Sequence, residues 1–326
     1  MTALLEIKGL KTHFRTEDGV IRAVDGVDLH VNEGEVLGIV GESGSGKTIT
    51  ALSAIRLIDS PGEIVAGSIR YEGRDVLAMS KNELTELRGD RISMIFQQPR
   101  VCLNPVLQIG RQITELFDQH RDISEAEARE NAINLLTSVG IPEAEKRFAF
   151  YPHELSGGQA QRVMIAIALA LSPRLLIADE PTTALDVTIQ AQIIELLKDM
   201  CRDLGTALIL VTHDLGVIAE IADRVAVMYA GQIVEEADVY TLFENPQHPY
   251  TRGLLTSMPV LGNRTGRLSA IPGSIPKPSD IPAACRFAPR CVERVARELT
   301  ICEQREPQIM GSEDHRVRCW LAEGAV

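Results

Sequence analysis

A segment near the N-terminus combines glycines, a lysine and a hydroxyl at a spacing suited to binding phosphate. The segment GESGSGKT (residues 41–48) follows an apolar run, 35–40, and opens a helical pattern, 47–58. The glycines let the backbone curl so that successive N–H groups point at one anion, and the helix N-terminus adds positive potential. In such loops the lysine reaches the β- and γ-phosphates and the final hydroxyl binds Mg²⁺. The predicted nucleotide-binding residues are Gly41, Ser43, Gly44, Ser45, Gly46, Lys47 and Thr48.

A second apolar run, residues 175–178, ends in two carboxylates, Asp179 and Glu180. An apolar run of this length predicts a buried strand, so both side chains are expected at its tip. Asp179 suits Mg²⁺, directly or through water, and Glu180 suits general-base work on an attacking water. The alternative is a strand end capped by two solvated acids. The phosphate-binding segment in the same chain favours the catalytic interpretation.

A third segment, LSGGQ (residues 155–159), precedes a predicted helix over 159–171. A Ser-Gly-Gly turn that opens a helix is another potential anion-binding site, because the first N–H groups of the helix are free to bind an anion. One nucleotide does not need two such sites on the same chain.

The three segments together resemble the ATP-binding subunits of ABC transporters, over about residues 4–245. In that family the signature segment of one subunit closes over ATP held by the phosphate loop of another. The resemblance therefore implies a dimer with ATP at the interface. It also implies that the signature segment acts on the ATP of the partner subunit, through Leu155, Ser156, Gly157, Gly158 and Gln159.

The same resemblance assigns roles to four further residues. Phe14 is similar to the aromatic residue that stacks on adenine, and Gln97 to the glutamine that contacts Mg²⁺ or water. Asp186 ends a segment (183–186) that resembles the D-loop at the dimer interface, and His213 is similar to the histidine that contacts the γ-phosphate. Many relatives have aspartate at the position of Gln98; this change lies outside the expected contacts with nucleotide. Core roles for Phe14 and His213 are the alternatives.

The implied reaction is phosphoryl transfer from ATP to water. Lys47, the phosphate-loop amides and Mg²⁺ neutralise developing charge, and Glu180 polarises the water. His213 and Gln97 hold the geometry, and hydrolysis releases the dimer. Thr48, Gln97 and Asp179 are the expected Mg²⁺ contacts.

Short apolar runs alternate with helical patterns over the first 240 residues, which favours an α/β fold with a mostly parallel sheet covered by helices. The runs at 35–40, 91–96, 175–178, 207–211 and 224–229 predict strands, the last of them in a hairpin through Ala230-Gly231, and 109–140 is mostly helical. The resemblance implies a P-loop NTPase of ABC type, with a RecA-like core, an N-terminal antiparallel β part and a helical subdomain at about 98–160.

Composition limits the class of protein. The 326 residues carry a net charge of −12, which counts against a nucleic-acid coat protein. Only one signature segment occurs and no sustained heptads precede it, so ABC-type ATPases acting on nucleic acid are a distant alternative. The longest uncharged apolar stretch, 163–173, is too short to span a membrane, because a spanning helix needs about 20 residues. Proline, cysteine and basic residues become more frequent after about residue 245, and the predicted domains are 1–245 and 246–326.

The C-terminal segments 245–255 and 267–273 resemble the extension found in ATPases of dipeptide, oligopeptide and nickel importers. The resemblance implies ATP-driven import of di- or oligopeptides, with nickel, glutathione or an opine as alternative cargo. It implies a second related ATP-binding subunit, two transmembrane permeases and an extracytoplasmic binding protein as partners. The chain is then expected at the cytoplasmic face of the membrane. A non-hydrolysing scaffold on a permease remains a further alternative.

Four cysteines of the extension, Cys285, Cys291, Cys302 and Cys319, are spaced C-x5-C-x10-C-x16-C. Disulfides are not expected in a reducing cytosol, and the close C-x2–4-C pairs typical of structural zinc are absent. Similar tails in this subfamily look able to hold a [4Fe–4S] cluster, although the gap between the second and third cysteines is longer here. The resemblance thus implies such a cluster, with zinc or no metal as alternatives.

The charge of a four-thiolate cluster could be offset by four neighbouring arginines, Arg286, Arg290, Arg294 and Arg297. The other two cysteines, Cys102 and Cys201, are expected to be ordinary buried thiols.

Overall fold

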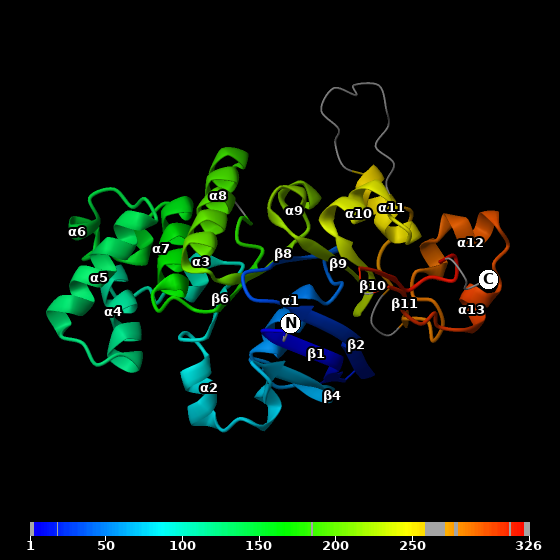
Figure 1. Ribbon diagram of the computed structural model, residues 1–326, viewed down its shortest axis with the longest axis horizontal. Helices are drawn as coiled ribbons and strands as arrows, with labels where there is room; N and C mark the ends of the chain where they lie inside the picture. Colours follow the sequence, from blue (N-terminus) through cyan, green and yellow to red (C-terminus); the bar gives the residue numbers. More distant parts are fainter. Residues whose placement is uncertain are drawn as a thin grey trace. The chain divides into compact units, whose positions relative to one another are not determined.

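The computed structural model describes residues 3–17, 19–183, 185–257, 271–276, 280–312 and 314–322. The chain divides into two compact units, whose helices and strands are labelled in Figure 1. Unit 1 comprises Met1–Leu4, Val31–Glu35 and Ala78–Leu210, and unit 2 comprises Leu5–His30, Val36–Leu77 and Val211–Val326. Within the described residues, no helix combines the length and the apolar character needed to cross a membrane.

Unit 1 carries most of the helices. Its elements are α2 (Lys81–Leu87), β6 (Ile92–Ile95), α3 (Pro99–Cys102), α4 (Ile109–His120), α5 (Glu125–Ser138), α6 (Ala144–Arg147), α7 (Gly157–Leu169), β7 (Leu175–Asp179), α8 (Val187–Leu204) and the start of β8 (Ala207–Thr212). The predicted strands at 91–96, 175–178 and 207–211 and the helices over 109–140 are confirmed.

Helix boundaries in unit 1 follow from local chemistry. Ser124 begins α5 by accepting a hydrogen bond from the Glu127 N–H at 3.2 Å, and Gly205 ends α8 in the left-handed conformation at φ 65°. Helix α8 buries Ile194, Leu197 and Cys201 on one face. The expectation of a buried thiol is therefore confirmed for Cys201. It is wrong for Cys102, which is exposed at the end of the short helix α3.

Unit 2 contains the predicted N-terminal antiparallel sheet, with strand order β2-β1-β4-β5. The strands are β1 (Leu5–Thr16), β2 (Gly19–Val31), β4 (Gly62–Tyr71) and β5 (Arg74–Asp75). Strand β1 pairs antiparallel with β4, and this register places Phe14 opposite Gly62.

A second, mixed sheet in unit 2 begins with β3 (Val36–Val40), which pairs in parallel with β9 (Arg224–Tyr229). Strand β10 (Gln232–Asp238) pairs antiparallel with β9, which confirms the predicted hairpin through Ala230-Gly231. The sequence predicted a mostly parallel sheet but did not predict the antiparallel strands that the C-terminal part of the chain adds to it. Two short strands near the C-terminus, β11 (Met310–Gly311) and β12 (His315–Val317), extend this sheet in antiparallel fashion from β10.

Short helices complete unit 2. They are α1 (Lys47–Ala54), α9 (Leu215–Ile221), α10 (Val239–Glu244), α11 (Pro249–Thr256), α12 (Val292–Ala296) and α13 (Ile301–Gln304). Helix α9 packs closely on β3 at Gly38, where an added Cβ would lie 2.6 Å from Ile218 Cδ1. A larger residue at position 38 would therefore push this helix off the strand.

Tyr250 and Phe287, which lie after residue 245, pack on the same core as the β9–β10 hairpin. The rings of Tyr229, Tyr250 and Phe287 form a cluster with centroids 4.7–5.4 Å apart. The fully buried Glu235 accepts hydrogen bonds from the N–H groups of Gln247 at 2.6 Å and His248 at 3.0 Å. The extension is thus fixed to unit 2 by both apolar and polar contacts.

His248, which caps α11, makes the stability of unit 2 depend on pH. Its Nδ1 accepts a hydrogen bond from the Tyr250 N–H at 3.0 Å, and burial lowers its pKa from 6.5 to about 3. Between these values the unfolded chain binds the extra proton, so the free energy of unfolding falls as pH drops below 6.5. We expect His248 to account for a loss of roughly 2 kcal/mol between pH 6.5 and pH 5.

Urea denaturation of the wild-type chain and of His248→Gln at both pH values measures this contribution. The variant should be less stable at pH 6.5 but should lose less stability on acidification to pH 5. His153→Gln, which changes an exposed histidine, is the control and should follow the wild type. Equal acid sensitivity of the wild type and His248→Gln would contradict the assignment.

Candidate nucleotide-binding and hydrolysis site

The phosphate-binding segment lies in unit 2 between β3 and α1, as the sequence predicted. Lys47 is the first residue of α1, and its side chain folds back over the loop. Its Nζ donates hydrogen bonds to the carbonyl oxygens of Gly41 at 2.7 Å and Glu42 at 3.1 Å. The Oγ of Ser45 is buried without a hydrogen-bond partner in the described part of the chain. A buried hydroxyl of this kind, beside a lysine, suits a phosphate oxygen.

The glycines of the loop are required by its shape. A Cβ on Gly41 would lie 2.2 Å from the carbonyl oxygen of Met228. Gly46 has φ +105°, and a Cβ there would lie 2.4 Å from the carbonyl oxygen of Ala23. No larger residue fits at either position. The loop therefore has the form needed to wrap its amides around an anion, and these residues fit the phosphates of a nucleotide.

Phe14 lies on β1 of unit 2 and is half-buried. A Cβ on its cross-strand partner Gly62 would lie 2.6 Å from Phe14 Cε1, so the ring packs directly over the backbone of β4. The absence of a side chain at position 62 leaves room for this ring position. Stacking of Phe14 on adenine stays a prediction.

In unit 1 the parallel pairing of β6 and β7 brings Gln97 and Glu180 together. Ile95 is the register partner of Ala178, so the residues that follow each strand lie at the same edge of the sheet. Gln97 Nε2 donates to Glu180 Oε2 at 2.9 Å, and Thr183 Oγ1 donates to the same oxygen at 2.9 Å. Asp179, the last residue of β7, is buried. Two donors thus fix the orientation of the Glu180 carboxylate, and its role as general base stays a prediction.

The sequence could not predict the backbone conformation of Glu180 or the role of Thr183. Glu180 lies in the left-handed region at φ 46°. This backbone conformation is uncommon for residues other than glycine. The hydroxyl of Thr183, three residues later in the chain, is then close enough to donate a hydrogen bond to the Glu180 carboxylate. A threonine after a strand-end glutamate is the only sequence signal for this contact.

The signature segment lies in unit 1 at the N-terminus of α7. Ser156 is exposed and caps this helix: its Oγ accepts from the Gln159 N–H at 3.3 Å, while Gln159 Oε1 accepts from the Ser156 N–H at 3.1 Å. Leu155 is buried, and its carbonyl oxygen accepts from Arg100 at 3.0 Å. Gly157 and Gly158 follow on a partly exposed turn. A Cβ on Gly158 would lie 2.9 Å from Ile189 of α8.

The two remaining predicted site residues are Asp186, which lies in unit 1, and His213, which lies in unit 2. Asp186 caps α8 in unit 1 by accepting from the Ile189 N–H at 3.0 Å; Ala184 of the predicted D-loop lies outside the described residues. In unit 2 His213 is exposed directly after β8. Its neighbour Asp214 caps α9 by accepting from the Gly216 N–H at 2.8 Å. The structure thus shows that Asp186 and Asp214 cap helices. The role of Asp186 at a dimer interface and the contact of His213 with the γ-phosphate stay predictions.

The expected [4Fe–4S] cluster is not supported. Cys285, Cys291, Cys302 and Cys319 are all buried. Among the described residues, however, no group of three or more histidine, cysteine, aspartate or glutamate side chains is placed to hold a metal ion. Burial raises the pKa of Cys285 to about 12 and that of Cys319 to about 11, so both are neutral thiols at pH 7. These residues do not fit a cluster, and no step of the chemistry is assigned to one.

The arginines expected to offset a cluster have other partners. Each forms an ion pair with a carboxylate: Arg286 with Asp25, Arg290 with Glu42, Arg294 with Glu303 and Arg297 with Glu293. The positive charge of this module is therefore balanced without thiolates. Because these arginines are paired with carboxylates, the prediction that they offset the charge of a cluster is wrong.

A phosphate loop after β3, paired carboxylates at the end of β7 and a signature segment at the start of α7 define an ABC-type ATP-binding cassette. Family models agree. Residues 24–183 match the ABC transporter family, and residues 234–297 match the C-terminal region of oligopeptide/dipeptide transporters.

Two relatives from Bacillus subtilis are similar over almost the whole chain. The oligopeptide transport ATP-binding protein AppD is 52% identical over 325 residues, which cover 99% of this chain and 98% of the relative. The oligopeptide transport ATP-binding protein OppD is 50% identical, covering 98% and 89%. The chain belongs to the ATP-binding proteins of the oligopeptide/dipeptide ABC transporter family.

Solved structures show the same fold. A dimeric structure of the ATP-binding cassette MJ0796 with ADP and phosphate bound is 30% identical, with a TM-score of 0.64, and covers 72% of this chain and 98% of that one. The cassette cbiO1 of Clostridium perfringens is 26% identical, also with a TM-score of 0.64, and covers 75% and 92%. The expected ABC-type α/β fold is confirmed.

Proposed function

We propose that this chain binds and hydrolyses ATP to energise the import of di- or oligopeptides. The proposal for cargo is carried by the full-length similarity to two relatives named for oligopeptide transport. The proposal for hydrolysis is supported by the Glu180 carboxylate, which two donors orient at the end of β7.

In the proposed reaction the predicted site residues have the following roles. Lys47 and the amides of the phosphate loop bind the phosphates, and Phe14 stacks on adenine. Glu180 takes the proton of the attacking water, while Gln97 keeps its carboxylate in position. His213 contacts the γ-phosphate. Thr48, Gln97 and Asp179 would hold Mg²⁺, which when bound would neutralise the charge that develops on the phosphate oxygens.

The proposed active form is a dimer of ATP-binding subunits, in which the signature segment of each subunit completes the site of the other. The exposed Ser156 and the partly exposed Gly157 at the start of α7 support this arrangement. The second subunit is proposed to be a related but distinct chain. Two permeases and an extracytoplasmic binding protein complete the importer, and this chain is proposed to lie on its cytoplasmic side.

Transport by the reconstituted importer tests this function. The complete set of subunits in proteoliposomes should take up labelled di- or oligopeptides only when MgATP is supplied on the side of this chain. Uptake of Ni²⁺, glutathione or an opine in place of peptides would overturn the peptide assignment and favour the alternative cargo.

Lys47→Ala should weaken nucleotide binding by the chain. The change removes the ammonium that pairs with the β- and γ-phosphates, and we expect affinity for a fluorescent ATP analogue to fall at least about tenfold. Lys81→Ala, at the exposed start of α2, is the matched control. Equal affinity in the Lys47→Ala and Lys81→Ala variants would refute the proposed role of the phosphate loop.

A further inference from the structure

The C-terminal extension contacts the phosphate loop at Glu42. Arg290 forms two parallel hydrogen bonds with its carboxylate, from Nη1 to Oε2 at 2.6 Å and from Nη2 to Oε1 at 3.0 Å. The Tyr250 hydroxyl accepts a hydrogen bond from the Glu42 backbone N–H at 2.9 Å. Both the side chain and the backbone of Glu42 are therefore held by residues of the extension. A bidentate arginine–carboxylate pair fixes direction as well as distance.

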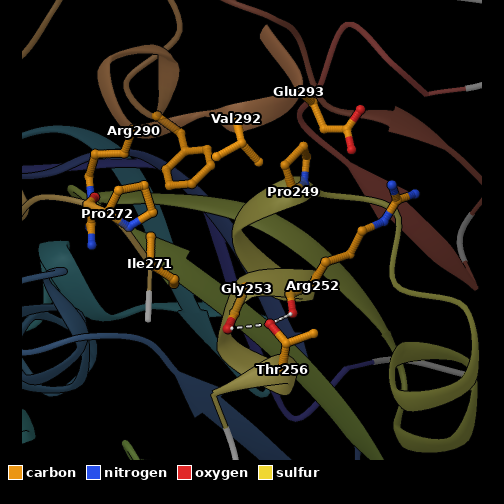
Figure 2. A pocket seen from close by; sticks show the side chains of 10 residues that line it. Pro249, Arg252, Gly253, Thr256, Ile271, Pro272, Arg290, Val292 and Glu293 are labelled. Carbon is orange, nitrogen blue, oxygen red and sulfur yellow. Dashed lines mark hydrogen bonds between the residues drawn. The ribbon is translucent and has the colours of Figure 1, made fainter. Parts of the chain in front are cut away.

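Arg290 is itself held firmly. Its side chain is 4% exposed, and its Nε donates to the carbonyl oxygen of Pro272 at 2.8 Å. Figure 2 shows Arg290 and Pro272 together at one end of a cavity of about 240 Å³. The guanidinium also lies 5.7 Å from the centroid of the Tyr229 ring. The hydrogen bonds to Glu42 raise the pKa of Arg290, so the guanidinium is charged at neutral pH.

Tyr250 is equally well fixed. It is fully buried, and its ring packs against Tyr229 with centroids 4.7 Å apart and against Phe287 at 5.4 Å. Phe287 belongs to the cysteine-rich part of the extension, and Tyr250 to α11. Two separate segments of the extension thus support the same loop residue through one aromatic cluster.

Glu42 also connects to the lysine that binds phosphate. The Glu42 carbonyl oxygen accepts a hydrogen bond from Lys47 Nζ at 3.1 Å, beside the one from Lys47 to Gly41. A shift of Glu42 therefore changes the surroundings of Lys47 directly. A buried ion pair by itself adds little net stability, because desolvation opposes the attraction. Its more direct consequence here is a fixed backbone position at the start of the phosphate loop.

We propose that Arg290 and Tyr250 are positioning residues for the phosphate loop, so that the C-terminal extension sets the affinity for nucleotide. This inference rests on the proposed function, because it requires ATP to bind at residues 41–48. It gives the extension a role in nucleotide binding in addition to its packing role in unit 2.

Three substitutions distinguish a positioning role of Arg290 and Tyr250 from a role of charge alone and from a role of packing alone. Arg290→Ala should weaken binding of a fluorescent ATP analogue to the full chain by about tenfold, through loss of two charge-assisted hydrogen bonds. Arg290→Lys retains the charge but cannot make the two parallel bonds, and should lose about fivefold. Tyr250→Phe removes only the acceptor for the Glu42 N–H and should lose about threefold. Arg297→Ala, in the same module, is the control and should bind like the wild type.

Kinetics of the assembled transporter give a readout that a packing role would not change. The Arg290→Lys and Tyr250→Phe variants should show a raised KM for ATP with kcat retained. The inference is overturned if both variants fold, bind the analogue and hydrolyse ATP like the wild type. A charge-only role, with Arg290→Ala impaired and Arg290→Lys normal, also overturns it. If the wild-type chain does not bind the analogue, the proposed function fails instead.

Discussion

Replacement of Glu180 by glutamine should lower the rate of ATP hydrolysis by at least about 100-fold while leaving ATP binding intact. The amide oxygen of glutamine can still accept a hydrogen bond from Gln97 or Thr183, so the local geometry at the end of β7 survives. What the substitution removes is the negative charge that draws a proton from water. General-base catalysis is commonly worth two to four orders of magnitude.

The experiment compares steady-state hydrolysis by the assembled transporter with equilibrium binding of an ATP analogue. A second, intact ATP-binding subunit would retain its own turnover, so a mixed complex should be measured with both strand-end glutamates replaced as well as with one. Glu86→Gln, at an exposed position on α2, controls for the loss of one carboxylate from unit 1. It should leave both quantities unchanged.

A Glu180→Gln complex that hydrolyses ATP within about threefold of the wild type would contradict the role of general base. An assembled wild-type complex without any ATPase activity would favour the non-hydrolysing scaffold. The hydrogen bonds from Gln97 and Thr183 argue against that alternative, because they orient the Glu180 carboxylate in a way that a scaffold would not need.

The parts of the site that the sequence predicted are local in the chain. The phosphate loop and the signature segment each lie within eight consecutive residues, and each opens a helix, so spacing alone determines which backbone groups point the same way. The pairing of Gln97 with Glu180 needed one further step, the parallel register of two predicted strands. The two segments follow from residue type and spacing, whereas the role of Gln97 came from the family resemblance.

The parts that the sequence could not predict join residues far apart in the chain. Arg290 lies 248 positions from Glu42, and Arg286 lies 261 positions from Asp25. No periodicity relates such residues, because their contact depends on how the extension folds back onto β9 and β10. Counting cysteines and arginines in the tail gave the right composition for a cluster but not the positions of the sulfur atoms.

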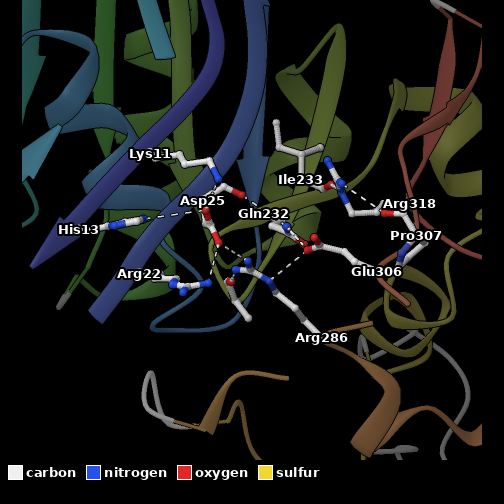
Figure 3. Close-up of polar contacts among 11 residues, drawn as sticks. Lys11, His13, Arg22, Asp25, Gln232, Ile233, Arg286, Glu306, Pro307 and Arg318 are labelled. Carbon is white, nitrogen blue, oxygen red and sulfur yellow. Dashed lines mark hydrogen bonds and ion pairs between the residues drawn. The ribbon is translucent and has the colours of Figure 1, made fainter. Parts of the chain in front are cut away.

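The largest stability effect is expected at Asp25, where the extension meets the N-terminal sheet of unit 2. Arg286 pairs with the Asp25 carboxylate, and both side chains are less than 10% exposed. Arg286 Nη1 also donates to the carbonyl oxygen of Ala230 at 2.6 Å, and Lys11 approaches Asp25 at 3.1 Å. Figure 3 shows Lys11, Arg22 and Arg286 converging on this carboxylate. Asp25 is thus a buried carboxylate at the centre of a charge cluster, in which Arg286 is buried and Lys11 and Arg22 are exposed.

The pKa of Asp25 reflects the strength of this cluster. Burial on its own would raise it, but hydrogen bonds from Arg286 and Lys11 outweigh burial and hold it below the ordinary value of 3.8. Because the folded-state pKa is depressed, the contribution of the pair is fully present above about pH 4 and is lost as pH falls through the lower folded value.

Arg286→Ala should therefore reduce the free energy of unfolding by about 3 kcal/mol at pH 7, because it leaves a buried carboxylate without its main partner. Arg297→Ala removes an ion pair from the same module, but there the arginine side chain is 58% exposed, and it should cost at most about 0.5 kcal/mol. Urea denaturation of the two variants and the wild type measures the difference. Replacing both Asp25 and Arg286 by alanine should cost less than the sum of the two single changes. An Arg286→Ala variant no less stable than Arg297→Ala would show that the tail is not anchored to the N-terminal sheet through this pair.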